Sequence, residues 1–351
     1  MRKYYTKACN FSYNSNPKNK ISTKNSLPLN GSAEIYFDSV EIITRNNIKK
    51  IKLKDLNKLN INLKNKIYKD IKNITKKKLF KKLNFTNSPL LMGVLNLTPD
   101  SFSDGGKFNS PIKSLARAKK LFDSGCDILD IGGESTRPGS HEISSQKEWL
   151  RISKSLKKIS KLKKFISIDT RKEYVMRKAN KYNINLINDI SGLNYDHSTL
   201  DFLKKTKIPF VIHHIKGTPL NMQNKPNYKN VLLDIYDYFE KKLKIVRSHG
   251  ITHNNIILDP GIGFGKNLKH NITILKNVSI FHSLGYPLLL GTSRKRFIKD
   301  ISGLNDSKYR IGGTLASCIF LKMQGVQILR VHDINEIKQG IKIFRALKFN
   351  E

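Results

Sequence analysis

The sequence has few cysteines, few acidic residues and no long hydrophobic run. Its 351 residues include three cysteines, Cys9, Cys126 and Cys318, which lie far apart. Their number and spacing exclude a disulfide framework beyond one bridge and exclude a paired-cysteine metal site, so we expect a reducing compartment. No apolar run approaches the ~20 residues that a membrane-spanning helix needs. We therefore expect no membrane partner.

Acidic residues are scarce relative to basic ones. The 27 aspartates and glutamates stand against 65 lysines and arginines, which gives a formal net charge of +38. On charge alone the chain could bind nucleic acid, and salt-sensitive retention on DNA would then be expected. However, 52 of the basic residues are lysines and only 13 are arginines, whereas proteins that read bases favour the arginine fork. We attribute the charge to a chain-wide composition and expect no nucleic-acid partner.

The N-terminal quarter of the chain differs from the rest. Residues 1–33 contain six basic residues, no acidic one and no apolar core of a secretory signal. They are interpreted as a basic disordered tail or as an organellar transit segment; without such import we expect a cytoplasmic protein. Residues 34–88 combine a strand-like run, Glu34–Thr44, with a lysine-rich stretch of helical periodicity, Leu53–Leu83. We expect a small extension or cap, packed on a main domain over residues 89–351.

From residue 88 onward, short apolar runs alternate with segments of helical periodicity. The apolar runs predict strands at Leu90–Leu97, Ile128–Ile131, Phe165–Ile168, Leu186–Ile190, Phe210–Ile215, Ile256–Leu258, Pro287–Leu290 and Gln327–Val331. The intervening segments predict helices at Ile112–Ser124, Gln146–Leu162, Glu173–Tyr182, His197–Thr206, Val231–His249, Asn271–His282, Arg310–Met323 and Asn335–Leu347. Eight strand-then-helix units predict an α/β fold, a parallel (β/α)8 barrel behind a short basic extension. A doubly wound open sheet is the alternative, although no G-x-G-x-x-G motif opens the first helix.

Polar or charged residues follow the apolar body of every predicted strand. In chain order they include Asn96, Glu134, Asp169, Asn188, His213, Asp259, Ser293 and Arg330. Active sites of (β/α)8 barrels lie at the carboxyl ends of the strands, so we expect these side chains to converge on one mouth. The first strand also leads into the loop TPDSFSDGG, whose two carboxylates, hydroxyls and phenylalanine exceed what a connector needs.

The alternation of side chains along a strand predicts what lies beneath that mouth. Residues two apart share a face, so Asn96 shares its face with Val94, and Asn188 with Ile190. If Asn96 points inward, Val94 lines the floor beneath it. An apolar floor with a polar rim suits a flat heteroaromatic ligand whose edge forms hydrogen bonds.

One half of the rim offers acceptors. Asp169, Asn188 and Asp259 could bind an amino-pyrimidine edge, which presents paired N–H donors. The alternative for an aspartate at a strand end is helix capping. The glycine-rich segment DPGIGFGK lacks the spacing of a P-loop, and we expect it to supply Phe264 as a wall.

The other half of the rim is cationic. Arg330, His332, Arg294 and Lys295 lie in the loops after the last two strands, which frequently bind phosphate in this fold. Asn96, Ser135 and Thr136 are expected nearby. A diphosphate with Mg²⁺ fits this set, because phosphate oxygens and waters can supply most of the ligands of Mg²⁺.

Eight motifs in order resemble those of the dihydropteroate synthase family of pterin-binding barrels. They are GVLNLTPDSFSDGG, DIGGESTRPGS, SIDTRK, INDISG, KGTPLNMQ, LDPGIGFGKN, GTSRK and LRVHD. The resemblance covers the chain from about Ser88 to the C-terminus. The resemblance implies a transferase of folate biosynthesis that joins (dihydropterinyl)methyl diphosphate to 4-aminobenzoate, forming dihydropteroate and diphosphate. It also implies Mg²⁺ as a cofactor.

The resemblance assigns roles to matching residues. Asp169, Asn188, Asp259 and Lys295 would bind the pterin ring, with Phe264, Val94, Ile190 and Leu289 as apolar walls. Thr136, Arg330 and His332 would bind the diphosphate, and Asn96 would ligate Mg²⁺. Phe102, Arg137 and Ser293 would form the 4-aminobenzoate site. The catalytic roles would fall to Lys295, Asp100 and Arg330.

The implied mechanism calls for loops that exclude water, since water would capture the methylene cation that forms when diphosphate leaves. We expect Leu97–Lys107 and Ser135–Glu142 to be those loops. One position departs from the family: His213 stands where a methionine is common, and it adds a titratable group. Helices near Arg310–Lys348 are expected to pair in a homodimer.

Two rival functions share the predicted barrel. A pterin-dependent methyltransferase would use the same acceptor edge but would not need the TPDSFSDGG loop or the diphosphate cluster. An inactive paralogue that only binds pterin would have lost Asn96, Lys295 or Arg330, and this chain retains all three.

Overall fold

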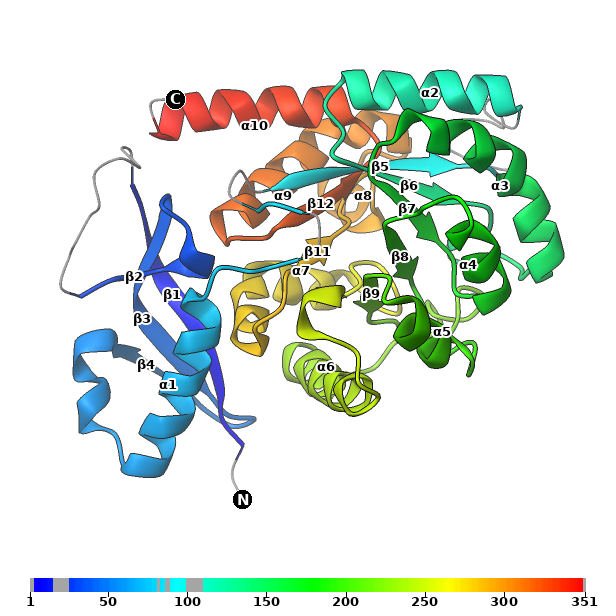
Figure 1. Ribbon diagram of the computed structural model, residues 1–351. Coiled ribbons are helices and arrows are strands. Elements are labelled where there is room, and N and C mark those ends of the chain that lie inside the picture. Colours follow the sequence, from blue (N-terminus) through cyan, green and yellow to red (C-terminus); the bar gives the residue numbers. More distant parts are fainter. Residues whose placement is uncertain (1–2, 15–24, 81–82, 86–88, 99–109, 350–351) are drawn as a thin grey trace.

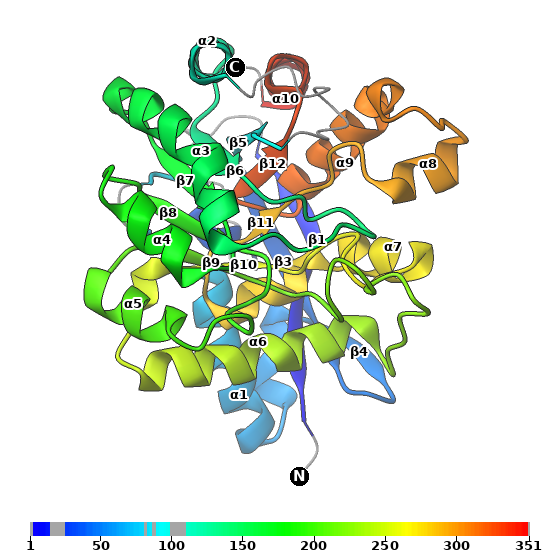
Figure 2. The ribbon, with the colours of Figure 1, turned by 90° about the vertical axis from the view of Figure 1, so that its right-hand side faces the viewer.

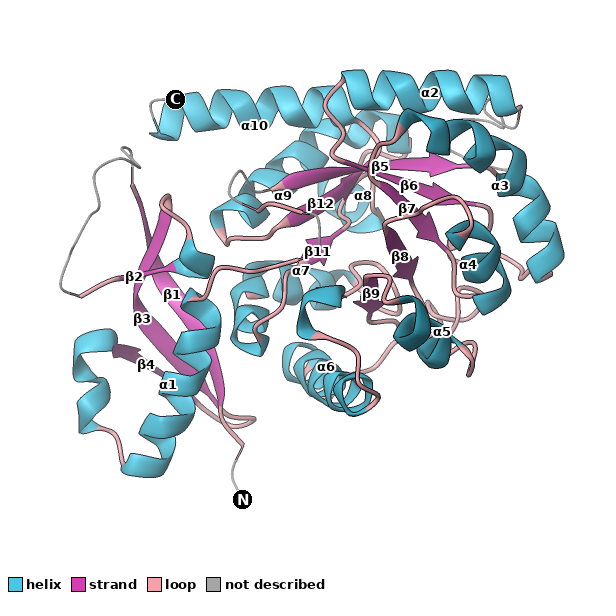
Figure 3. Ribbon diagram, viewed as in Figure 1, coloured by secondary structure: helices cyan, strands magenta, loops and turns pink. Residues whose placement is uncertain are grey.

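The computed structural model describes residues 3–14, 25–80, 83–85, 89–98 and 110–349. It contains a large barrel and, packed against one side of it, a small N-terminal unit with its own antiparallel sheet (Figures 1 and 3). Every helix in these described ranges is too short or too polar to cross a bilayer.

Eight parallel strands form the barrel, as predicted. They are β5 (Leu90–Asn96), β6 (Ile128–Gly132), β7 (Ile166–Asp169), β8 (Leu186–Asp189), β9 (Phe210–His213), β10 (Ile256–Asp259), β11 (Leu289–Leu290) and β12 (Ile328–Val331). Their order in the sheet is β10-β9-β8-β7-β6-β5-β12-β11, and a bridge between Leu258 and Leu288 joins the two ends. The (β/α)8 fold class is therefore confirmed.

The helices surround the strands (Figure 2). They are α2 (Pro111–Asp123), α3 (Ser145–Ile159), α4 (Glu173–Asn180), α5 (Thr199–Thr206), α6 (Val231–Ser248), α7 (Leu268–Lys276), α8 (Arg296–Ser302), α9 (Ile311–Met323) and α10 (Ile334–Phe349). Side chains of Ser110, Ser144, Asn230 and Asn267 cap four of them by accepting a backbone N–H. The sequence did not predict the seven-residue α8. The predicted helix Asn271–His282 divides into α7 and the 3₁₀ segment η5 (Val278–Leu284).

The barrel interior is layered. An apolar layer, together with Phe80 from the segment before the barrel, consists of Met92, Ile128, Leu186, Val211, Ile257, Leu289 and Ile328. Because side chains alternate along a strand, the residue two positions later on each strand also faces inward. Those residues are Val94, Asp130, Asn188, His213, Asp259, Gly291 and Arg330, so polar groups begin one layer above the apolar one.

The N-terminal unit begins earlier than predicted. Strands β1 (Tyr5–Tyr13), β3 (Ile35–Ile43), β2 (Leu27–Pro28) and β4 (Ile48–Lys52) form its sheet, and the unit also holds the 3₁₀ segments η1 (Leu29–Gly31) and η2 (Leu53–Lys58) and helix α1 (Ile61–Thr75). The prediction of a disordered tail over residues 1–33 is therefore wrong for β1, which pairs with β3 along its length. Ala8, Leu29 and Phe37 belong to one buried core, which explains why this basic segment is ordered.

The N-terminal unit packs on the barrel through specific contacts. The Tyr5 ring meets the Tyr236 ring edge-on, with centroids 5.1 Å apart. Asn73 Nδ2 donates to the Ser283 carbonyl at 2.9 Å, and a salt bridge of 2.8 Å joins Lys322 to Glu34. The unit thus contacts the barrel on α6, η5 and α9.

Candidate active site

Strand register places three of the predicted polar residues, with Gly132 between two of them, on neighbouring strands. Asn96 is paired with Gly132, Gly132 with Asp169, and Asp169 with Asn188 across β5, β6, β7 and β8. A Cβ at Gly132 would lie 3.4 Å from Asn96 Oδ1 and 3.5 Å from Asp169 Cβ. Glycine at this position therefore leaves room between two polar side chains on the same rim.

A pocket opens at this end of the barrel. Its empty volume is about 450 Å³, including the part that is open to solvent. Its lining consists of Thr136, Asn188, Ile190, His213, Asp259, Ile262, Phe264, Gly291, Ser293, Lys295, Arg330 and His332. Most of the residues predicted for a site thus converge from strands and loops that are far apart in the chain.

The centre of the site is a buried ionic cluster that the sequence analysis did not identify. Arg330 donates from Nε to Asp130 Oδ2 and from Nη2 to Asp169 Oδ2, both at 2.7 Å. Asp130 is fully buried and also accepts from Asn188 Nδ2 at 3.0 Å. Asp130 therefore fixes both the Arg330 guanidinium and the orientation of the Asn188 amide.

Within the described residues, this cluster leaves buried acceptors without a donor. Asp169 Oδ1, Asn188 Oδ1 and Asp130 Oδ1 form no hydrogen bond. A buried acceptor without a partner is costly, so these oxygens favour a ligand that brings N–H groups. Burial raises the pKa of Asp169, an effect that Arg330 opposes and the neighbouring Asp130 carboxylate reinforces.

Asp259 and His213 lie on paired positions of β10 and β9. Asp259 Oδ1 accepts from the Gly261 backbone at 2.7 Å, and burial raises the pKa of Asp259 to about 6. Gly261 has a φ of +70°, and a Cβ there would lie 2.0 Å from the His214 carbonyl, so the turn requires glycine. Burial, with nearby Lys266 and Lys295, lowers the pKa of His213 well below its ordinary value.

Lys295 and Phe264 form one wall of the pocket. Lys295 Nζ lies 4.2 Å from the centroid of the Phe264 ring, a cation–π geometry. The Phe264 ring also meets His213 edge-on at 4.6 Å. Burial and the neighbouring Arg330 together lower the pKa of Lys295 to about 8, while Asp259 opposes the shift.

The cationic half of the rim is less positive than its sequence suggests. Arg330 is bound by two carboxylates, and Arg294 pairs with Asp333, with Nε 2.9 Å from Oδ2. Burial and Arg330 lower the pKa of His332 to about 3, so its ring is neutral. His332 Nδ1 lies 3.0 Å from Ser293 Oγ. Of the four residues expected as cations, His332 is therefore neutral, and the two arginines keep their charge but are paired with carboxylates.

The remaining predicted residues lie around the pocket or outside the described ranges. Val94 is buried in the layer below the rim, and Arg137 is half-buried on the loop after β6. Asp100, Phe102 and most of the predicted closing loop Leu97–Lys107 lie outside the described residues. No three His, Cys, Asp or Glu side chains of the described ranges come together as a metal site. A Mg²⁺ beside Asn96 would therefore depend on oxygen ligands from a substrate.

Comparison with known proteins matches the barrel as a whole. The family model "Pterin binding enzyme" matches residues 92–332. The Escherichia coli dihydropteroate synthase is 39% identical over 259 residues, which cover 74% of this chain and 91% of that protein.

Solved structures agree with this match. The Yersinia pestis dihydropteroate synthase, solved with a sulfonamide drug, has a TM-score of 0.72 and is 38% identical in sequence. The alignment covers 76% of this chain and 96% of the Yersinia pestis chain. The Thermus thermophilus enzyme, in complex with 4-aminobenzoate, has a TM-score of 0.69 and 33% identity, with 77% and 100% coverage. The chain belongs to the dihydropteroate synthase family of pterin-binding transferases.

Proposed function

We propose that this chain condenses (dihydropterinyl)methyl diphosphate with 4-aminobenzoate to give dihydropteroate and diphosphate, and that its pocket holds the pterin by the amino-pyrimidine edge. The observation that carries this proposal is the pair of buried oxygens without a donor, Asp169 Oδ1 and Asn188 Oδ1. The edge of a pterin presents N–H groups that would satisfy both. Asp259 supplies a third acceptor from β10.

The walls of the pocket suit the flat faces of the pterin ring. Ile190 and Phe264 line the pocket, and Val94 lies buried in the layer beneath. Lys295 approaches the same space from the opposite loop as a hydrogen-bond donor. Since its pKa is about 8, a large share of Lys295 is protonated at neutral pH.

The diphosphate would lie at the neighbouring side of the rim. Thr136 offers a hydroxyl, and the neutral His332 offers a ring N–H and not a charge. Arg330 keeps its charge, but Asp130 and Asp169 already bind it, so it attracts the diphosphate less than a solvent-exposed arginine would. Its role is to hold Asp169, the carboxylate that accepts from the pterin edge, in place beside the departing diphosphate.

Mg²⁺ is proposed at Asn96, the one polar side chain at the end of β5. Bound there, with oxygens of the diphosphate and water as its other ligands, Mg²⁺ would neutralise charge on the leaving group. The reaction breaks the bond between the methylene carbon and the diphosphate oxygen, which keeps the electron pair. The amine nitrogen of 4-aminobenzoate then forms the new C–N bond and releases a proton.

The 4-aminobenzoate would bind between the loop of Arg137 and the turn of Ser293. Ser293 lines the pocket, and its Oγ lies 3.2 Å from the His332 backbone nitrogen, which donates to it. Arg137 provides a cation that matches the benzoate carboxylate. Phe102 and Asp100 keep the roles that the family resemblance gives them.

The pterin proposal is tested by calorimetry with a dihydropterin that lacks the diphosphate. Asn188→Leu keeps the size of the side chain but removes its acceptor. We expect about a 10- to 100-fold loss of affinity, the cost of one or two hydrogen bonds to a buried donor. Asn96→Ala is the control, since it should leave this affinity unchanged. Wild-type affinity in the Asn188→Leu variant would overturn the assignment.

The Mg²⁺ proposal is tested with the wild type and Asn96→Ala, using the diphosphate substrate. We expect EDTA to weaken substrate binding by the wild type, and to have no further effect on Asn96→Ala. An equal response of both proteins to EDTA would place the metal elsewhere.

We also propose that the chain is a homodimer formed through α9 and α10. Three large apolar side chains are exposed on these helices: Phe320 is 47% exposed, Ile343 58% and Leu347 81%. Single exposed apolar residues are common, but three on two packed helices favour an interface. Light scattering of the wild type and of Ile343→Lys tests this; a monomeric wild type would refute it. For location, we propose the cytoplasm or, if the N-terminus directs import, an organelle.

A further inference from the structure

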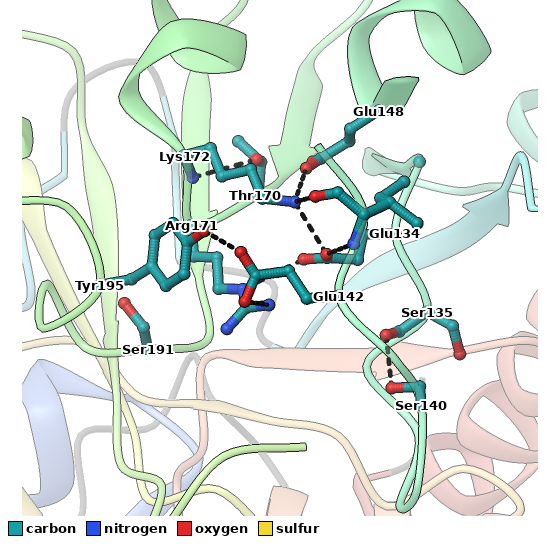
Figure 4. Close-up of polar contacts among 12 residues, drawn as sticks. Glu134, Ser135, Ser140, Glu142, Glu148, Thr170, Arg171, Lys172, Ser191 and Tyr195 are labelled. Carbon is teal, nitrogen blue, oxygen red and sulfur yellow. Dashed lines mark hydrogen bonds and ion pairs between the residues drawn. The ribbon is translucent and has the colours of Figure 1, made fainter. Parts of the chain in front are cut away.

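A second buried ionic cluster lies beside the pocket, where the loop between β6 and α3 begins (Figure 4). Lys172 Nζ lies 2.7 Å from Glu134 Oε1 and 2.9 Å from Glu148 Oε2. Arg171 Nε lies 3.1 Å from Glu134 Oε2. All four side chains are at most 9% exposed. The two positive and two negative charges balance one another. We call these four side chains the base, in the sense of a structural support for the loop.

The base holds both ends of the loop Ser135–Glu142. Glu134, which precedes the loop, accepts from the backbone N–H of Ile143, which follows it, at 3.1 Å. Lys172 Nζ donates to the carbonyl of Ile143 at 2.7 Å. Burial alone would raise the pKa of Glu134, but Arg171 and Lys172 hold it below its ordinary value, so Glu134 stays ionised.

Above the base, three side chains close over one another. Glu142 Oε2 lies 3.3 Å from Arg171 Nη2, and Glu142 Oε1 accepts from the Tyr195 hydroxyl. The Arg171 guanidinium lies over the Tyr195 ring, 4.3 Å from its centroid. Burial and Glu142 raise the pKa of Tyr195 to about 12, so the hydroxyl keeps its proton. We call Glu142, Arg171 and Tyr195 the clasp.

Two of the three clasp residues are open to water, whereas Arg171 also belongs to the base and is 9% exposed. The side chain of Glu142 is 52% exposed, and Tyr195 is 37% exposed. Exposed ion pairs and cation–π contacts are weak individually, so the clasp can break while the base stays intact. The loop that it holds carries Thr136, which lines the pocket, and Arg137. Tyr195 comes from the loop after β8, the strand that carries Asn188.

We propose that Glu142, Arg171 and Tyr195 are positioning residues that hold the Ser135–Glu142 loop in the conformation that binds 4-aminobenzoate. The inference rests on the proposed function, because it concerns the second substrate of that reaction. When the clasp breaks, the binding-competent fraction of the loop falls, and the apparent affinity for 4-aminobenzoate falls by that fraction. The pterin edge, built on the strands, is unaffected.

The test uses two substitutions at solvent-exposed positions, Glu142→Gln and Tyr195→Phe. Each should raise the KM for 4-aminobenzoate by about 3- to 10-fold, as expected for weak exposed contacts. The affinity for a dihydropterin without the diphosphate, whose binding makes no use of Thr136, should stay the same. The double variant should be no worse than the more affected single variant. Glu173→Gln and Tyr174→Phe are matched controls, since both act through Arg177 away from the loop.

Equal losses of affinity for 4-aminobenzoate and for this dihydropterin, or no change in either variant, would overturn the proposal, because a merely structural contact affects both ligands alike or neither. Hydrogen exchange at the backbone amides of residues 136, 137 and 139–141 provides a readout that does not need activity. It should accelerate in Glu142→Gln and not in Glu173→Gln, and equal exchange would also overturn the proposal. A wild type that forms no dihydropteroate, yet shows this acceleration, would refute the proposed function and leave the clasp standing.

Discussion

Removing Asp130 should both destabilise the barrel and weaken pterin binding. Asp130 is fully buried and accepts from Arg330 Nε at 2.7 Å and from Asn188 Nδ2 at 3.0 Å. In Asp130→Ala the guanidinium keeps only Asp169, and the amide loses its acceptor. A hydrogen bond to a charged group contributes about 1.5–3 kcal/mol, and breaking a buried pair by removing one partner costs about 3–5 kcal/mol. We expect the free energy of unfolding to fall by about 3–5 kcal/mol.

Urea unfolding measures this change, and the single tryptophan, Trp149 on α3, reports on the barrel through its fluorescence. Asp300→Ala is the control. Asp300 pairs with Arg296 at 3.5 Å, but the Arg296 side chain is 80% exposed, so the loss should stay below about 1 kcal/mol. If Asp130→Ala loses no more than this control, Asp130 does not hold the cluster together and the account of the site is wrong.

Three further predictions follow from burial and charge. Lys295 has a pKa of about 8 in the folded protein and an ordinary value of 10.5. Between these values the unfolded chain binds more protons than the folded one, so the free energy of unfolding should rise from pH 8 to 10.5. Urea titration of the wild type against Lys295→Met measures this rise. Asp259, with a pKa of about 6, should become protonated as the pH falls through 6, and calorimetry should then show weaker pterin binding. The His213→Met variant should show the same pH profile, because burial keeps His213 neutral. Phe80→Ala removes a buried ring from the apolar layer and should cost about 3–5 kcal/mol, seen as a lower urea midpoint.

The barrel could be predicted because its strands are buried on both faces. Each then appears as a short apolar run, and each run ends at a polar residue where the strand leaves the core. Seven of the helices were also predicted near their observed bounds, since their apolar residues recur with helical periodicity. The seven-residue α8 is too short to show that periodicity. Strand β1 was missed because its partner, β3, lies about 30 residues later, and its side chains carry no uniform pattern.

The site was predicted in its members but not in its connections. Asn188, Asp259 and Lys295 were found because they lie at or beyond the carboxyl ends of apolar runs, whereas Asp130 lies in the middle of one. Its signal was an aspartate two residues before a strand end in the run ILDIG, a charge that must face a partner inside the barrel. That partner, Arg330, lies 200 residues later. Only closure of the barrel brings the two together, so the loss of free positive charge at Arg330 and His332 could not be read from the sequence.

The most direct test of the central claim is the ratio of diphosphate released to dihydropteroate formed by the purified chain, given both substrates and Mg²⁺. The account predicts one diphosphate for each dihydropteroate, and a strongly reduced rate of both in Lys295→Ala. Pterin binding with no release of diphosphate would contradict it and would favour an inactive pterin-binding paralogue.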